Sequence, residues 1–251
     1  MPEEDQKSNG GVNLARLLLY YIIIGFLGWI FFSFIFTSPF FGIERVTIHG
    51  NNYLCNEDIL IQAGIEFQTN LFHFNLKEAS QRLLGNPWVD SVLIRKKFPN
   101  QLSIEIAERQ PKVLLVWDNQ FYLVNKEGII LLVSDQLSNQ FGLTILTGLD
   151  IGTKKSGDVI DCQEYIKVQK IIVALEDIFP DQFYKIQIVS IDEYLLFHKE
   201  HPIKVRIESS DQLVNEWYLL ESAMQKVIQE KIPLKEINMK FKDRLSIILE
   251  E

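Results

Sequence analysis

Two short segments carry residue types that could do chemistry. Gly152–Val159 has the glycine spacing of a phosphate-binding loop, but Asp158 and Val159 stand where such a loop needs lysine and then serine or threonine. A carboxylate there would repel a phosphate, so we interpret the segment as an ordinary loop. His198–His201 offers two imidazoles and a carboxylate, which are ligand types that zinc accepts. Because it precedes Pro202 between two predicted strands, we interpret it as a polar turn and expect no metal there.

No other signature of catalysis is present in the sequence. The chain lacks the motifs G-x-S-x-G, H-E-x-x-H and S-x-x-K, and Cys55 and Cys162 have no nearby histidine. We therefore expect no catalytic residue, no cofactor and no small-molecule substrate. The alternative from the enzyme class is an anchored hydrolase, which would need a polar cleft with perturbed titratable groups.

The charge balance argues against nucleic acid as a partner. Lys and Arg number 25 against 33 Asp and Glu, a net charge of -8, so the field of the whole molecule repels phosphate backbones. The basic triplet Arg95–Lys97 is shorter than the 4–8 basic residues of a lipid-binding cluster, and we interpret it as a solvated strand end.

The elements that must position any site begin with a membrane anchor. Leu17–Phe36 is a run of 20 uncharged, mostly apolar residues. At about 1.5 Å per residue it spans a hydrocarbon core of about 30 Å. A cleaved signal peptide would end at a small-residue site, which the following Thr37–Phe41 lacks. We predict a transmembrane helix over 17–36 that is retained.

The segment before this helix, residues 1–16, is predicted to be a short cytoplasmic tail. Lys7 and Arg16 precede the apolar run and Arg45 follows it, so the positive-inside rule favours a cytoplasmic N-terminus. All folded mass then lies C-terminal to the anchor and outside the cytoplasm. Its net charge of about -7 argues against a domain lying flat on an anionic leaflet.

Residues 43–109 have the order strand, helix, helix, strand, strand. Ile43–His49 alternates and stops at Gly50, and Asn56 can cap a helix that Gly64 ends. A second helix is predicted over Leu76–Leu84, with Asn75 as its cap and Glu78 completing a capping box. Trp88–Lys96 and Leu102–Ala107 are predicted to be strands around a turn at Phe98–Asn100.

This order resembles a POTRA domain, and several segments are similar to the FtsQ/DivIB family of bacterial division proteins. The matching segments are Ile43–Gly50 (IERVTIHG), Asn51–Leu54, Asn86–Val92 (NPWVDSV), Arg95–Leu102 (RKKFPNQL), Glu108–Pro111 (ERQP), Asn119–Ile130 and, more loosely, Ile237–Leu249. The short N-terminal tail departs from the family, and Ser134–Asp161 contains no segment that aligns.

Residues 111–251 are predicted to be a second, β-rich domain with two longer helices, which makes the chain an α+β protein. Alternation predicts a β-meander through Val113–Trp117, Phe121–Val124 and Ile129–Val133. Helices are predicted over Tyr165–Ile178 and Gln212–Gln229, and further strands over Lys185–Ser190, Tyr194–Phe197 and Ile203–Glu208. A hairpin of Glu236–Phe241 and Leu245–Leu249 completes the chain.

The resemblance implies a non-catalytic, bitopic scaffold of the divisome in the cytoplasmic membrane at the division septum. In this family the scaffold joins FtsB (DivIC) and FtsL and regulates septal peptidoglycan synthesis. The alternative is a component of a transport or secretion system, in which POTRA domains also occur. The residues after Pro111 are too few for a barrel of 16 strands at about 10 residues each.

The candidate partner-binding site is the first strand of the C-terminal hairpin and its turn. We expect Ile237, Met239 and Phe241 to pack on the core, and Glu236, Asn238 and Lys240 to meet solvent. A strand at a sheet edge can accept a strand from another protein. If this strand is such an edge, the partner binds at Ile237, Asn238, Met239, Lys240, Phe241, Lys242 and Asp243.

Overall fold

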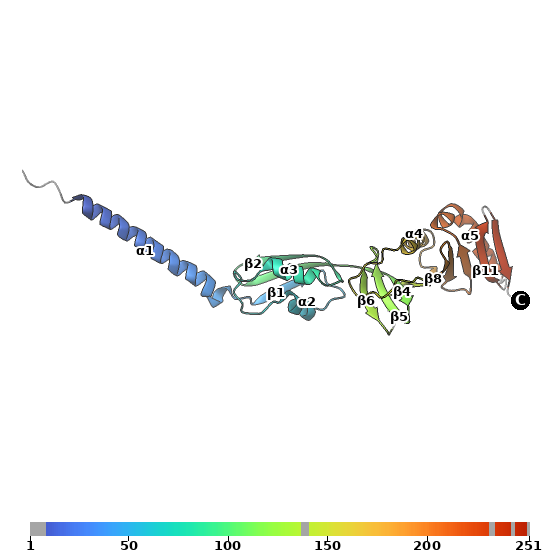
Figure 1. Ribbon diagram of the computed structural model, residues 1–251, viewed down its shortest axis with the longest axis horizontal. Helices are drawn as coiled ribbons and strands as arrows, with labels where there is room; N and C mark the ends of the chain where they lie inside the picture. Colours follow the sequence, from blue (N-terminus) through green and yellow to red (C-terminus); the bar gives the residue numbers. More distant parts are fainter. Residues whose placement is uncertain (1–8, 137–140, 231–233, 242–243, 250–251) are drawn as a thin grey trace, which may run out of the picture. The chain divides into compact units, whose positions relative to one another are not determined.

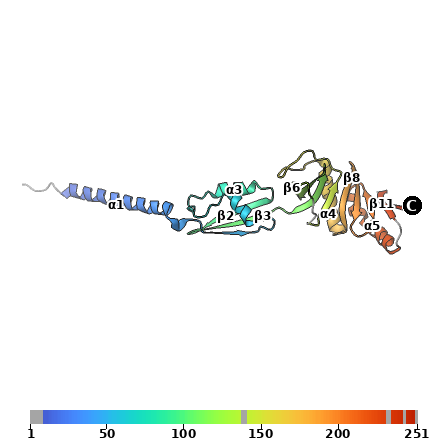
Figure 2. The same cartoon turned by 90° about the horizontal axis from the view of Figure 1, so that it is seen from below.

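The computed structural model describes residues 9–136, 141–230, 234–241 and 244–249 (Figures 1 and 2). The chain forms two compact units. The first consists of the residues up to Gly85 together with Val89–Glu108, and the second consists of Asn86–Trp88 together with the chain from Arg109 onward. The α+β class and the single N-terminal apolar helix predicted from the sequence are confirmed.

The first unit opens with helix α1 (Asn9–Thr37), followed by a short 3-10 helix, η1 (Pro39–Phe41). Within α1, Arg16–Thr37 is long and apolar enough to cross a membrane. Its most apolar 18 residues have a mean hydropathy of 2.2, and none of them is buried inside the protein. A helix that is apolar on all sides and covered by nothing in the protein is suited to a lipid environment. Ser38 then caps η1, its hydroxyl oxygen accepting from the backbone N–H of Phe40 at 3.3 Å.

The rest of the first unit is a three-stranded sheet with two helices. Strand β3 is central, with β1 parallel to it on one side and β2 antiparallel on the other. Both helices and all three strands contribute to one apolar core, which includes Ile59, Leu83 and Ile104. The elements are β1 (Arg45–His49), α2 (Asn56–Ala63), α3 (Leu76–Leu84), β2 (Val89–Lys97) and β3 (Gln101–Glu108).

The helix caps agree with the sequence at two positions and differ at two. Gly64 ends α2 with a φ of 68°, a left-handed conformation that favours glycine, and the side chain of Asn75 accepts from the N–H of Glu78. Asn56 is not the cap of α2, because the helix begins one residue earlier than predicted, with Cys55 at the cap. Glu78 does not return to its cap, since its carboxylate pairs with Arg82 at 2.6 Å.

The second unit is built on a nine-stranded sheet in the order β12-β11-β10-β9-β8-β7-β4-β5-β6. Strands β4, β5 and β6 form the predicted meander. Helices α4 and α5 pack on one face of this sheet (Figures 1 and 2). The elements are β4 (Pro111–Trp117), β5 (Gln120–Asn125), β6 (Ile130–Ser134), β7 (Thr144–Thr147), α4 (Gln163–Ile178), β8 (Phe183–Ser190), β9 (Glu193–His198), β10 (Lys204–Ile207), α5 (Ser210–Glu230), β11 (Leu234–Phe241) and β12 (Arg244–Leu249).

Strand β7 was not predicted from the sequence, although the sheet depends on it. It pairs in parallel with β4 on one side and with β8 on the other, so it joins the meander to the remaining strands. Its four residues, Thr144–Thr147, lie in the stretch for which the sequence shows no motif. Such a short strand carries too little alternation to be recognised without its neighbours.

A single carboxylate holds the turn that follows β1 in the first unit. Glu108, at the end of β3 and only 9% exposed, accepts three backbone N–H groups, from Asn52 at 2.7 Å, Tyr53 at 2.8 Å and Leu54 at 2.9 Å. Hydrogen bonds to an ionised group are among the stronger ones in proteins. Glu108 therefore joins two segments that carry the family resemblance, Asn51–Leu54 and Glu108–Pro111.

We predict that Glu108→Ala lowers the local free energy of unfolding of the first unit by about 2–3 kcal/mol, because three backbone N–H donors lose their charged acceptor. The measurement is hydrogen exchange of the β3 amides in the detergent-solubilised chain. Glu105→Ala is the matched control on the same strand, since its ion pair with Arg95 is about half exposed and worth at most about 1 kcal/mol. Equal exchange rates in the two variants would contradict the role given to Glu108.

Candidate partner-binding edge

Strand β11, on which the predicted site lies, is not an edge of the sheet. It pairs in parallel with β10 through Ile237 and Asn238, and it pairs antiparallel with β12 along its other side. The condition on which the predicted site rests, that this strand is the sheet edge, is not met, because the hairpin joins the sheet through its first strand and leaves its second strand outermost. Lys242 and Asp243, in the predicted turn, lie outside the described residues.

Where the side chains of β11 are described, from Glu236 to Lys240, they follow the predicted alternation with one exception; the side chain of Phe241 lies outside the described part. Ile237 and Met239 are fully buried, Asn238 is half-buried and Lys240 is exposed. Glu236 was expected to meet solvent but is only 8% exposed. Its burial has a specific cause on the neighbouring strand.

That cause is Arg206 on β10, which forms a bidentate pair with Glu236. Its Nε and Nη2 atoms lie 2.5 Å and 3.0 Å from the two carboxylate oxygens, and its Nη1 donates to Glu193 of β9 at 2.6 Å. The hydrogen bond from Arg206 holds the pKa of Glu193 below its usual range. The guanidinium thus connects β9, β10 and β11, and it fixes the strand against which β12 pairs.

Strand β12 is the outermost strand at this end of the sheet, and its side chains are largely apolar and exposed. Ile247, Ile248 and Leu249 are 45%, 44% and 54% exposed, and β11 is its only partner strand in the described part of the chain. Ile248 lies in register with Glu236, on the face opposite the buried Ile237. An apolar edge strand of this kind presents a row of backbone groups for pairing with another chain.

At the opposite end of the same sheet, the glycine-containing loop at Gly152–Val159 pairs with the first residue of β6. Beyond β6, the backbone of Ile130 accepts from Gly157 at 2.8 Å and donates to Asp158 at 2.9 Å. The carboxylate of Asp158 accepts from the N–H of Lys155 at 2.9 Å. Asp158, whose carboxylate made the segment unsuitable for phosphate, thus stabilises the loop through its side chain and binds Ile130 of β6 through its backbone.

In the first unit, the outer strand β2 is protected in a different way. Near its end it carries three consecutive basic residues, Arg95, Lys96 and Lys97. Charged side chains on an edge strand disfavour pairing with another strand. Among these three edges, β12 is therefore the one that combines open backbone with exposed apolar side chains. The signal in the sequence was the apolar segment Leu245–Leu249, which the prediction assigned to the second strand of the hairpin.

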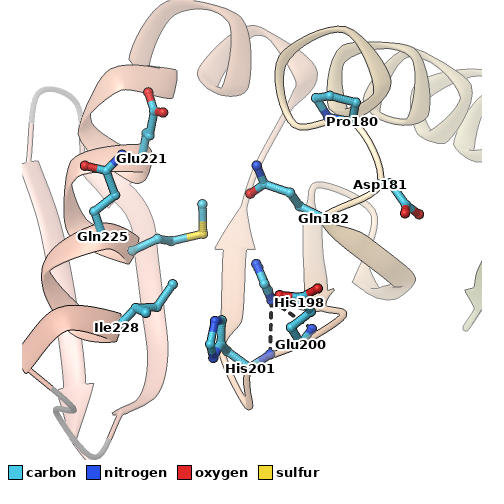
Figure 3. Close-up of a pocket in the computed structure, with 10 residues that line it drawn as sticks. Pro180, Asp181, Gln182, His198, Glu200, His201, Glu221, Gln225 and Ile228 are labelled. Atoms are coloured by element: carbon cyan, nitrogen blue, oxygen red, sulfur yellow. Dashed lines mark hydrogen bonds between the residues drawn. The ribbon is translucent and has the colours of Figure 1, made fainter.

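The two histidines considered for metal line a polar pocket of about 440 Å³ between α5 and the end of β9 (Figure 3). The Nδ1 atom of His198 accepts the backbone N–H groups of Glu200 and His201 at 3.1 Å and 3.2 Å, as a turn requires. The His201 ring lies 5.1 Å from the His198 ring. In the ranges that the structure describes, no three His, Cys, Asp or Glu side chains gather as metal ligands would.

Comparisons with known proteins agree with the resemblance seen in the sequence. The sequence profile described as "POTRA domain, FtsQ-type" matches residues 41–109. A cell division protein FtsQ of Syntrophotalea carbinolica is 34% identical over 114 residues, which cover 45% of this chain and 39% of that protein. A cell division protein DivIB of Clostridium botulinum is 31% identical over 126 residues, which cover 50% of this chain and 49% of that protein. The chain thus spans less than half the length of these relatives.

We predict that acid destabilises the second unit partly through His198. Burial lowers the pKa of this imidazole, as does the neighbouring His201, against the opposing effect of Glu200. The unfolded chain therefore binds a proton more readily, so stability falls as the pH drops below the ordinary histidine pKa of about 6.5. Between about pH 7.5 and about pH 5.5 the thermal midpoint should fall more in the unmodified chain than in His198→Asn, which keeps an acceptor oxygen. Identical pH dependence in the two proteins would show that His198 plays no part.

Proposed function

From the FtsQ-type POTRA domain and the similarity to FtsQ and DivIB proteins, we propose that the chain belongs to the FtsQ/DivIB family and is a non-catalytic, single-pass membrane scaffold of the bacterial divisome. Its domains are a cytoplasmic tail (1–16), a transmembrane helix (17–36), the POTRA domain (43–109) and the C-terminal β domain (111–251). Its partners are FtsB/DivIC-like and FtsL-like division proteins, and the complex regulates septal peptidoglycan synthesis. It acts in the cytoplasmic membrane at the division septum.

The observation that carries the proposal is the open apolar edge at β12. A partner segment adds as a further strand, its backbone pairing with β12 while side chains on either side contact Ile247 and Ile248. The partner-binding site, first predicted on β11, is therefore proposed on the neighbouring strand β12. Ile237, Met239 and the Arg206–Glu236 pair then support the edge from behind and are not contact residues.

Several features favour a scaffold over an anchored enzyme. In the pocket of Figure 3, the Nδ1 of His198 is already committed to two backbone amides, so it is not available as a base. At Cys55, a hydrogen bond to Asp58 is the main reason that the pKa of the exposed thiol is raised, which lowers the fraction of reactive thiolate. Neither group has the environment that a nucleophile requires.

The proposal includes an orientation, with residues before Arg16 in the cytoplasm and the chain after Phe41 outside. We predict that alkaline phosphatase fused after Glu251 is active in cells, because this enzyme needs an oxidising compartment. A matched fusion to a reporter that works only in the cytoplasm should be inactive. Activity of the cytoplasmic reporter alone would reverse the orientation.

The binding prediction concerns Ile248, on the outer face of β12. Ile248→Lys should weaken capture of the FtsB/DivIC-like and FtsL-like proteins at least about tenfold, because it places a charge against the added strand at the centre of the contact. The measurement is a titrated pull-down with the detergent-solubilised chain, together with a thermal melt. The melt should be unchanged, because Ile248 is half exposed and lies on the face away from the buried Ile237.

Leu93→Lys is the matched control, since Leu93 on β2 is also 44% exposed. Proline substitutions at Ser246 and Ile247 test the backbone directly. The N–H groups of neighbouring residues point to opposite sides of a strand, so one of the two prolines removes an outward donor without breaking the pairing with β11. Normal capture by folded variants at all three positions of β12 would exclude strand addition at this edge.

A further inference from the structure

Large apolar rings are exposed at the end of the first unit that adjoins α1. Phe40 is 61% exposed, Phe67 is 54% exposed and Phe98 is 60% exposed. Phe40 follows α1 by three residues, and Phe67 precedes Gln68, whose N–H donates to Ile43 at 2.9 Å. Phe98 lies in the β2–β3 turn. Three loops that are distant in the sequence thus each place an uncovered phenylalanine at the same end of the domain.

A chain of ring contacts joins two of these loops to the start of the domain. Phe72 lies in the centre, with its ring centroid 5.2 Å from that of Phe41 and 5.2 Å from that of Phe98. Phe41 in turn contacts Phe40 at 5.2 Å, and Phe72 contacts Phe36 of α1 at 5.7 Å. Such tilted and edge-on contacts are the favourable geometry for aromatic pairs. Phe40 and Phe98 therefore belong to one packed cluster and are not independent surface residues.

Polar contacts hold this cluster at the end of the apolar helix. The side-chain amide of Asn70 donates to the backbone oxygens of Ile35 and Phe36 at 2.9 Å and 3.1 Å, and its oxygen accepts from the N–H of Phe72 at 2.9 Å. Carbonyls at the end of a helix have no partner within it, so a side chain that binds them fixes what lies next to the helix end. If α1 crosses the membrane, the loop at 70–73 is thereby held at the level of the lipid headgroups.

Basic side chains lie in a row beside the aromatic cluster. Arg45 and Lys97 are both in register with Gln101, one on each side, at the end of the sheet next to Phe98. Both are exposed, and Lys96 is half-buried beside them. Two acidic residues belong to this rim: Glu44, which accepts a hydrogen bond from Asn100 at 2.7 Å, and the exposed Glu66, which precedes Phe67. Arg45, Lys96 and Lys97 against these two carboxylates leave one excess positive charge here, although the chain as a whole carries -8.

From this arrangement we infer that the aromatic end of the POTRA domain is a membrane-contact surface, which we call the lipid seat: Phe40, Phe67 and Phe98 with Arg45 and Lys97. The rings enter the headgroup region and the two cations bind anionic lipid phosphates. Charges more than about 10 Å away are screened, so the acidic remainder of the chain does not cancel the attraction at this rim. The domain meets the bilayer end-on, in agreement with the expectation that it does not lie flat.

The test places an environment-sensitive NBD fluorophore on the full chain in lipid vesicles. The background is Cys55→Ser with Cys162→Ser, which removes the two native cysteines. The fluorophore is attached through Phe98→Cys or, as the control, through Leu84→Cys, at the end of α3 and just before β2 begins. Leu84 is 48% exposed, so both labels leave the core untouched.

In vesicles of phosphatidylcholine and phosphatidylglycerol with a lipid spin-labelled near the headgroup, we expect the fluorescence at position 98 to fall at least twofold and that at position 84 to stay unchanged. Absence of quenching at position 98 overturns the lipid seat, and equal quenching at both positions overturns the end-on contact. Arg45→Gln with Lys97→Gln should remove the additional quenching that phosphatidylglycerol causes. An unchanged lipid dependence in that variant overturns the assignment of the cations.

This inference relies on one element of the proposed function, that α1 crosses the bilayer. A carbonate wash of the same vesicles tests that element separately, because an inserted helix resists extraction. Protein that is washed away contradicts the membrane anchor, whereas protein that stays without quenching at position 98 contradicts only the lipid seat. Failure to bind division proteins would leave both results unaffected, so the two proposals are distinguishable.

Discussion

The constraint on which this structure depends is that every backbone amide and carbonyl of a sheet needs a partner, and that the outer strands of an open sheet have too few. The chain meets this constraint differently at three of its outer strands, β6, β2 and β12. At the start of β6 the loop at Gly152–Val159 supplies partners for the backbone of Ile130, and on β2 a run of basic residues disfavours a further strand. At β12 neither device is present in the described residues. Of these three edges, β12 is the one whose exposed side chains are apolar and which remains suited to pairing.

Two charged side chains hold the strands that surround these edges. Glu108 ties the turn after β1 to the end of β3 through three backbone amides, and Arg206 links β9, β10 and β11. In both cases the charge is largely buried and its hydrogen-bonding capacity is used by several partners, which is the condition under which such a group stabilises a fold. The position of β12 thus follows from a polar network behind it as well as from apolar packing.

At the end of the first unit next to α1, aromatic side chains hold separate segments together, as the two charged side chains do elsewhere. Phe41, Phe72 and Phe98 come from three separate loops, yet they form one cluster, and Asn70 connects it to the last carbonyls of α1. The basic residues that protect the end of β2 from strand pairing lie beside this cluster. The same three residues, Arg95–Lys97, therefore both disfavour strand pairing at β2 and add positive charge beside the aromatic cluster.

The sequence by itself determined the apolar helix, the strand and helix order of the POTRA domain, the meander and the resemblance to the FtsQ/DivIB family. These features are local, because alternation, caps such as Asn75 and Gly64, and turn residues act over a few neighbours. Only the tertiary structure decided which strand is outermost, that Glu236 is buried against Arg206, that β7 bridges the two halves of the sheet, and that three distant phenylalanines share one end of the domain. Strand order and side-chain neighbours depend on contacts between segments far apart in the chain, and the alternation of a single strand carries no information about what lies on either side of it.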